Sequence, residues 1–190
     1  MRIGLLGGSF DPPHNGHLLA AGDAFEALAL ERLVFIPAAI QPLKAHQDAA
    51  GPEHRLAMVR LLVEGDPRFA VDPIEIDRGG LSYTVDTLSA VAAASPSAEL
   101  FWLVGADVVR LFPQWREPRR ITELATVVVL ERNDEAPDLS AIPGAARTVP
   151  TRRIDISSTE VRKRVREGKS IRGFVPDAVA DYIAAERLYR

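Results

Sequence analysis

The sequence predicts an α/β fold with a doubly wound parallel sheet, for two reasons. Several short segments are apolar at every position, which is typical of strands buried on both faces of a parallel sheet. Helical stretches of about ten or more residues separate these segments, as the crossovers between parallel strands require. A small C-terminal helical part is expected to follow the sheet.

Apolar runs predict the strands, and Pro37 closes the second of them. The third extended region is broken at Pro73, and the last strand is short. It follows a loop within 133–150, a stretch with three prolines and little periodicity. The expected extended segments are Ile3–Leu6, Leu33–Pro37, Arg68–Asp77, Glu99–Val104, Thr126–Leu130 and Ala146–Val149.

Helical spacing and helix-ending residues predict the helices. Leu18, Ala21, Phe25 and Leu28 share one face of a first helix. The glycines at 79 and 80 turn the chain into a later helix, which Ser95-Pro96 ends. The other expected helices are Glu53–Glu64, Tyr83–Ala94 and two within Ser157–Tyr189, separated near Gly168–Pro176.

Composition excludes several classes of protein. The chain has 190 residues, 47% hydrophobic, which suits one domain (1–190) with a substantial core. Charged residues make up 26% and the net charge is −3, so no global attraction to nucleic acid or membrane is expected. No segment approaches about eighteen consecutive apolar residues, and the first residues do not resemble a signal peptide. The absence of cysteine excludes disulfides, thiolate metal sites and a cysteine nucleophile. We expect a cytoplasmic enzyme.

A glycine-rich turn joins the first strand to the first helix and carries two histidines. Backbone N–H groups of such a turn can close on an anion, and the helix N-terminus adds a partial positive charge. His14 and His17 stand at i and i+3, so both face what the turn holds. The turn is therefore a predicted phosphate site with two donors. Its binding residues are Gly7, Gly8, Ser9 and Phe10.

A purely structural interpretation of this turn exists. Gly-Gly after a strand is common, and Asp11-Pro12-Pro13 is an ordinary lead-in to a helix. A single histidine would more often be a satisfied surface residue. Two histidines at this spacing, on this turn, favour function.

Further polar groups follow the ends of other predicted strands. Lys44 lies in the loop after the second strand, Asp107 follows the fourth, and Ile156–Thr159 follow the last. In an open parallel sheet, ligands bind at the carboxyl ends of strands where the strand order reverses. Convergence of these groups is an expectation from the fold.

The segment that starts the first C-terminal helix has two compatible interpretations. Ser157 with Glu160 fits a capping box, which would only begin the helix. The segment 147–172 also carries nine basic and three acidic residues, although part of this charge belongs to a solvated helix face. Ser157, Ser158 and Thr159, followed by Arg162, therefore form a second predicted anion site for the outer phosphates of a nucleoside triphosphate.

Both anion sites resemble the signatures of the nucleotidyltransferase superfamily. Gly8–Pro12 match G-[ST]-F-D-P, His14–His17 match H-x-G-H, and Ile156–Arg162 match I-S-[SA]-T-x-[IVL]-R. The resemblance implies a Rossmann-like nucleotidyltransferase fold. It also implies catalytic roles for His14, His17 and Arg162.

Nearly the whole chain resembles the bacterial nicotinate-nucleotide adenylyltransferases. Tyr83-Thr84, Gly105-Ala106-Asp107 and Trp115 occur in the order of that family. The resemblance implies that Trp115 stacks on the pyridine ring, with Tyr83 beside it, and that the Thr84 N–H binds the carboxylate. A buried core tryptophan is the alternative for Trp115, although its neighbours favour an exposed loop. Asp107 would bind ribose hydroxyls or cap a helix.

Two departures from the family affect the mononucleotide site. The family often has Pro-Pro-His and a basic residue after the second strand, whereas this chain has Gln41-Pro42-Leu43-Lys44. Lys44 is then left to contact the mononucleotide phosphate, unless His46 substitutes for the missing histidine. Arg132 stands where the family has an arginine, but Asn133-Asp134 replace the usual Pro-Gly.

The resemblance implies adenylyl transfer from ATP to nicotinate mononucleotide, with Mg²⁺ bridging phosphates and no protein side chain ligating the metal. The expected partners are these two small molecules, and we expect no binding to nucleic acid or membrane. Whether the chain forms a homo-oligomer is left open. A phosphopantetheine adenylyltransferase is one alternative, although that family has threonine where this chain has His14. A non-catalytic nucleotide sensor is another, which pyrophosphate release would exclude.

Overall fold

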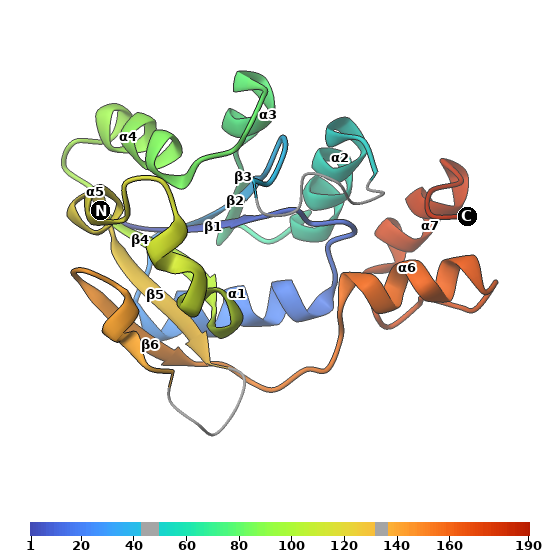
Figure 1. Cartoon of the computed structure of the whole chain (residues 1–190). Coiled ribbons are helices and arrows are strands. Elements are labelled where there is room, and N and C mark those ends of the chain that lie inside the picture. Colours follow the sequence, from blue (N-terminus) through green and yellow to red (C-terminus); the bar gives the residue numbers. More distant parts are fainter. Residues whose placement is uncertain (43–49, 132–136) are drawn as a thin grey trace.

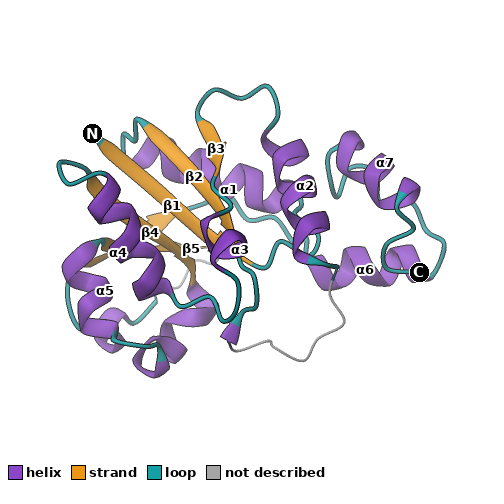
Figure 2. Cartoon of the chain, turned by 90° about the horizontal axis from the view of Figure 1, so that it is seen from above, coloured by secondary structure: helices purple, strands orange, loops and turns teal. Residues whose placement is uncertain are grey.

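The computed structural model describes residues 1–42, 50–131 and 137–190. Its sheet has six strands in the order β3-β2-β1-β4-β5-β6, and every pair of neighbours is parallel. Figure 2 shows β3, β2, β1, β4 and β5 lying side by side. The strands are β1 Arg2–Gly8, β2 Arg32–Pro37, β3 Phe69–Val71, β4 Glu99–Gly105, β5 Thr126–Glu131 and β6 Ala146–Pro150. The predicted parallel sheet is confirmed.

Helices cover both faces of this sheet, as a doubly wound fold requires. Figure 1 shows α1 and α4 on opposite sides of β1. The α-helices are α1 Asn15–Ala27, α2 Pro52–Val63, α3 Ile74–Arg78, α4 Thr84–Ala94, α5 Pro118–Leu124, α6 Ser158–Arg166 and α7 Asp177–Ala185. The described residues also include the 3₁₀ segments η2 Ala106–Gln114 and η3 Leu139–Ala141.

Alternation along β4 shows why its sequence is apolar throughout. Phe101 and Leu103 belong to the core cluster that contains α1 and α2 residues. Leu100, Trp102 and Val104 belong to the cluster on the other face, with residues of α4, η2 and α5. Because successive side chains of a strand point to opposite faces, a strand between two helical layers needs apolar residues at every position.

The expected extended segment Arg68–Asp77 is wrong over its second half. Only Phe69–Val71 form a strand, and Ile74–Arg78 form the short helix α3. Pro73 ends the strand, and Asp72 Oδ1 accepts the Ile74 N–H at 3.0 Å, which starts the helix instead. Inside α3, the buried Glu75 accepts a hydrogen bond from the Thr87 hydroxyl at 2.7 Å. Local turn chemistry outweighed the apolar pattern here.

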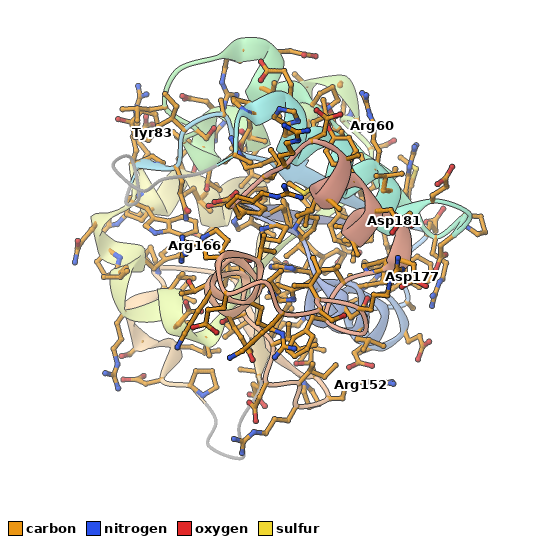
Figure 3. The ribbon with its side chains drawn as sticks, turned by 90° about the vertical axis from the view of Figure 1, so that its right-hand side faces the viewer. Arg60, Tyr83, Arg152, Arg166, Asp177 and Asp181 are labelled. Carbon is orange, nitrogen blue, oxygen red and sulfur yellow. The ribbon has the colours of Figure 1, made fainter. Side chains whose placement is uncertain are left out.

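The two predicted C-terminal helices are confirmed, and they pack on α2 through a third cluster. Met58 of α2 lies in it with Val161 of α6 and Val179 of α7. The connection between α6 and α7 carries Arg172, which pairs with Asp177 at 2.9 Å and with Asp181. Figure 3 shows these two aspartates on α7. All three side chains are exposed, so the pairs add little stability.

Within the described ranges, no helix is both long enough and apolar enough to cross a membrane.

Leu88 of α4 is fully buried against the sheet and tests the two-layer packing. We expect Leu88→Ala to lower the free energy of unfolding by about 2–5 kcal/mol, because it leaves a cavity under α4. Urea denaturation measures this loss. Ser89→Ala, on the exposed side of the same helix, is the control and should change stability by less than about 0.5 kcal/mol. Equal losses in both variants would contradict the assigned burial.

Candidate active site

The glycine-histidine turn lies at the switch point of the sheet. β1 has β2 on one side and β4 on the other, so the strand order reverses between β1 and β4. The last residue of β1, Gly8, pairs with Pro37 at the end of β2. Gly105 ends β4 at the same edge, and Asp107 follows it in η2. Ligands of open parallel sheets bind at this kind of edge.

The two histidines stand at the start of α1 and project to the same side, as their spacing predicts. Their ring centroids are 3.7 Å apart, with 32° between the planes. His14 is the N-cap residue, and its backbone N–H donates to Nδ1 of His17 at 3.2 Å. Because Nδ1 accepts this bond, the neutral ring of His17 carries its proton on Nε2. A hydrogen-bond donor at Nε2 is what a phosphate oxygen requires.

Packing holds the residues that precede the histidines. The ring of the buried Phe10 meets that of His17 edge-on, with 5.2 Å between centroids. Phe10 has φ of 49°, a left-handed backbone that is strained for a non-glycine residue and often marks functional turns. Gly7 lies against the indole of Trp102, and an added Cβ would be 2.7 Å from two atoms of that ring. Only glycine allows this approach.

The second predicted anion site docks directly onto the first. Ser158 donates its hydroxyl hydrogen to the Pro12 carbonyl at 2.8 Å. Arg162 Nη1 donates to the Asp11 carbonyl at 2.7 Å, and Nη2 donates to the Thr159 hydroxyl at 3.3 Å. The N-terminus of α6 thus lies against the turn that carries the histidines. Two positive helix ends meet there, which favours a polyphosphate.

Both interpretations of Ser157 are compatible with this geometry. Ser157 is the N-cap of α6, and its Oγ accepts the Glu160 N–H at 3.1 Å, so the capping role is confirmed. A hydroxyl that accepts one bond keeps its own hydrogen for another acceptor. Ser158, by contrast, has given its hydroxyl hydrogen to Pro12, so only its backbone N–H remains to donate to an anion.

Arg55, which the sequence did not single out, holds together the loops around the turn through hydrogen bonds to their backbone carbonyls. Its buried guanidinium donates to the carbonyls of Ser9 at 2.9 Å, Ala38 at 2.6 Å and Ala39 at 2.8 Å. Its Nε donates to Ala50 O at 3.0 Å. Burial lowers the pKa of this guanidinium, and the negative charge of Asp11 opposes the shift. One signal in the sequence could have identified Arg55. Its position shares a helix face with Met58, Val59 and Leu62, and an arginine on an apolar face needs buried hydrogen-bond partners.

Three of the predicted mononucleotide residues lie beside η2 or at the start of α4. Tyr83 is the N-cap of α4 and Thr84 its first residue. Trp115 follows η2 and stacks on Phe112, with centroids 5.0 Å apart and 29° between the planes. The guanidinium of Arg116 lies 5.0 Å from the centre of the Tyr83 ring, so the two segments are neighbours. Trp115 is half-buried, which is intermediate between a core tryptophan and one on an exposed loop. Its neighbours at 113, 114 and 116 are exposed.

Asp107 is exposed at the carboxyl end of β4, and its carboxylate folds back over Gly105. An added Cβ on Gly105 would lie 2.6 Å from Oδ1 of Asp107. Gly105 is the N-cap of η2 and no side chain caps this segment, so the capping alternative for Asp107 is wrong. Its position remains compatible with ribose binding.

The loop that follows β2 is tied to both halves of the candidate site. Ser9 donates its hydroxyl hydrogen to Gln41 Oε1 at 2.6 Å. Ser82 Oγ accepts the Ala39 N–H at 2.9 Å, and the Ser82 N–H donates to the Ile40 carbonyl at 2.9 Å. The predictions for Lys44, His46 and Arg132 lie outside the described residues. Among residues 1–42, 50–131 and 137–190, no cluster of His, Asp or Glu could hold a metal ion.

Solved structures share this fold. "Plasmodium falciparum nicotinic acid mononucleotide adenylyltransferase complexed with NaAD" superposes with a TM-score of 0.82 at 18% identity, covering 99% of this chain and 97% of that one. The same enzyme complexed with APC gives 0.80 at 19% identity, covering 99% and 96%. At such low identity the likeness shows the fold alone, and it confirms the expected Rossmann-like nucleotidyltransferase fold.

Sequence relatives carry the assignment further. The chain matches the cytidylyltransferase-like family over residues 5–164. A relative from Gemmatimonas aurantiaca, named "Probable nicotinate-nucleotide adenylyltransferase", is 56% identical over 199 residues, covering 100% of this chain and 93% of the relative. A relative of the same name from Thermus thermophilus is 47% identical over 190 residues and covers 100% of both chains. This chain therefore belongs to the nicotinate-nucleotide adenylyltransferase family.

Proposed function

We propose that this protein transfers the adenylyl group of ATP to nicotinate mononucleotide, giving deamido-NAD and pyrophosphate, a step of NAD biosynthesis. One observation carries the proposal: the histidine pair and the N-terminus of α6 meet on a single turn at the switch point of the sheet. The relatives named above support the nicotinate nucleotide over phosphopantetheine. The proposal takes residues 1–190 as one nucleotidyltransferase domain that acts on small molecules in the cytoplasm.

The reaction needs orientation and neutralisation of charge, with no general base. A 5′-phosphate oxygen of the mononucleotide attacks the α-phosphorus of ATP, a new P–O bond forms, and the bond to pyrophosphate breaks. The attacking oxygen is already ionised near neutral pH. Holding two reactants in line can remove about 7–11 kcal/mol from a barrier. The protein's remaining task is to stabilise negative charge as it spreads over the phosphates.

In this proposal, different residues bind different phosphates of ATP. His14 and His17 donate to oxygens of the α- and β-phosphates, with Gly7–Phe10 forming the turn around them. Ser157, the first-turn N–H groups of α6 and Arg162 hold the departing pyrophosphate. A guanidinium has five N–H donors, so Arg162 can bind phosphate while it keeps its bonds to Asp11 and Thr159.

The donor set fits a Mg²⁺ ion that arrives bound to ATP. Magnesium keeps most of its waters and takes oxygen ligands from substrate phosphates, so it needs few protein carboxylates. Asp11, the carboxylate within the turn, already accepts hydrogen bonds from Ala50 N and the Tyr189 hydroxyl. When bound, the ion would supply further neutralisation of phosphate charge.

The mononucleotide would lie across β4 toward α4. Trp115 would stack on the pyridine ring through the indole surface that Phe112 does not cover, with Tyr83 beside it. The N–H of Thr84 opens α4 without a side-chain cap, so a carboxylate can take that place. Asp107 would bind ribose hydroxyls. Lys44 and Arg132 are proposed for the mononucleotide phosphate and the nucleotide site from sequence alone.

Substrate choice tests the proposal directly. We expect kcat/KM for nicotinate mononucleotide to exceed that for nicotinamide mononucleotide at least about tenfold, because a helix N-terminus favours a carboxylate over an amide. Pyrophosphate release measured side by side with both mononucleotides checks this. No pyrophosphate release with either one would support a nucleotide sensor instead.

His17→Ala should lower kcat by about 10²–10³, the loss seen when one charge-stabilising donor is removed. The measurement is pyrophosphate release at saturating ATP and mononucleotide. His54→Gln is the matched control, because His54 contacts Tyr182 of α7 rather than the turn. Turnover close to that of the wild type would remove His17 from the mechanism.

Trp115→Ala should raise KM for the mononucleotide by roughly tenfold and leave KM for ATP nearly unchanged, because stacking is lost on one substrate only. Trp115→Phe retains an aromatic face and should restore much of the affinity. Equal changes in both KM values would show that the indole does not stack on the pyridine ring.

A further inference from the structure

The C-terminal segment returns to the turn that carries the histidines. Asn15, directly after His14, donates its backbone N–H to Phe174 O at 2.9 Å and its side-chain amide to Gly173 O at 2.8 Å. Tyr189, the penultimate residue, donates its hydroxyl to Asp11 Oδ1 at 2.6 Å. Figure 1 shows α6 and α7 at the end of the molecule where β1 leads into α1. The last residues of the chain are thus in contact with the turn.

Asp11, a residue that is 7% exposed, connects four parts of the molecule through its carboxylate. Its Oδ1 accepts from the Tyr189 hydroxyl and from Ala50 N at 3.0 Å. Its Oδ2 lies 3.7 Å from Arg162 Nη1, the nitrogen that also donates to the Asp11 carbonyl. Arg162 therefore contacts Asp11 at both its backbone carbonyl and its carboxylate.

Tyr189 supplies a donor to that carboxylate without adding charge. Burial and the bond to Asp11 raise the pKa of the Tyr189 hydroxyl, so it stays protonated and donating across the physiological range. Arg55 and Arg162 both lie near Asp11. The negative charge of Asp11 therefore lies between two positive charges, next to the turn that carries the histidines. If the tyrosine bond were missing, Asp11 would satisfy its buried charge by drawing the Arg162 guanidinium closer.

The backbone near the chain end is held in place. Arg187 has φ of 54° and Tyr189 has φ of 64°, both in the left-handed region that non-glycine residues avoid. Such conformations persist only where surrounding contacts determine them. The contact of Tyr189 with Asp11 is one such constraint.

We propose that Tyr189 is a positioning residue for the ATP polyphosphate: its hydroxyl holds the Asp11 carboxylate, and Asp11 sets the Arg162 guanidinium against the turn. This inference rests on the proposed function, because it assigns Arg162 to the phosphates. The alternative role is structural, in which the tyrosine ring only packs in the cluster of α6 and α7. Tyr189→Phe separates the two, since it keeps the ring and removes the hydroxyl.

The test measures the affinity of the full-length chain for a non-hydrolysable ATP analogue with Mg²⁺ by calorimetry. We expect Tyr189→Phe to weaken binding about five- to twentyfold, near the lower end of what one hydrogen bond to a charged group contributes, because the effect reaches the analogue through Asp11 and Arg162. KM for the mononucleotide should stay within about twofold of the wild type, because that site lies on other elements. Tyr182→Phe is the matched control: it removes a different tyrosine hydroxyl, which lies on α7 and contacts His54 at 2.9 Å, and it should leave the affinity unchanged.

A second variant shows whether Tyr189 acts through Arg162. In an Arg162→Ala background, Tyr189→Phe should change analogue affinity less than about twofold, because the residue it positions is gone. A full five- to twentyfold loss in that background would overturn the proposed route. So would wild-type affinity in the Tyr189→Phe single variant, even with a lowered melting temperature, since that result describes a structural role.

The outcomes separate this inference from the proposed function. If the wild-type protein binds the analogue but transfers no adenylyl group to nicotinate mononucleotide, the proposed function is wrong. The role of Tyr189 is then still tested by the affinity for the analogue. A wild-type protein that transfers adenylyl groups, with Tyr189→Phe binding the analogue equally well, removes the inference alone. A wild-type protein that binds no analogue overturns both.

Discussion

The hydrogen bond from Arg162 to the Asp11 carbonyl is the contact on which the candidate site depends. It joins residues 151 positions apart and brings the N-terminus of α6 against the turn that begins α1. Each helix end alone would attract an anion weakly, because the field of a helix terminus falls off within about one turn. Together with the bond from Ser158 to Pro12, this contact brings the N-termini of α1 and α6 to one turn.

This arrangement buries charged groups, which costs free energy of folding. Arg55, Asp11 and Arg162 lie at the edge of the core, and a buried ion that loses its partner is strongly destabilising. The cost is offset because Arg55 donates to backbone carbonyls on three segments and Asp11 accepts from two further donors. A fully satisfied polar cluster is rigid, and rigidity allows donors to meet the developing charge of a transition state without reorganisation.

The two halves of the site are built on different elements, which lets them act separately. In the proposed site, the polyphosphate half would use the ends of β1, α1 and α6, whereas the mononucleotide half would use η2 and the start of α4. The loop after β2 links them, because Ser9 contacts Gln41 and Ala39 contacts Ser82. In-line transfer requires both substrates to be placed relative to each other, and these contacts connect the two halves through the described part of the loop.

Residues within a few positions of one another were enough to predict the buried strands, the histidine pair and the cap of α6. Continuous apolar runs arise from burial on both faces, and the spacing of His14 and His17 follows from helix geometry. The expected extended segment 68–77 is wrong in its second half, because turn chemistry at Asp72 and Pro73 outweighed the apolar pattern and made α3 a helix. The partners of Arg55, the docking of α6 on Asp11 and the contact of Tyr189 with the turn arise from long-range contacts of the folded chain. Those contacts join residues up to 178 positions apart, and such pairs leave no local pattern because the folded backbone alone brings them together.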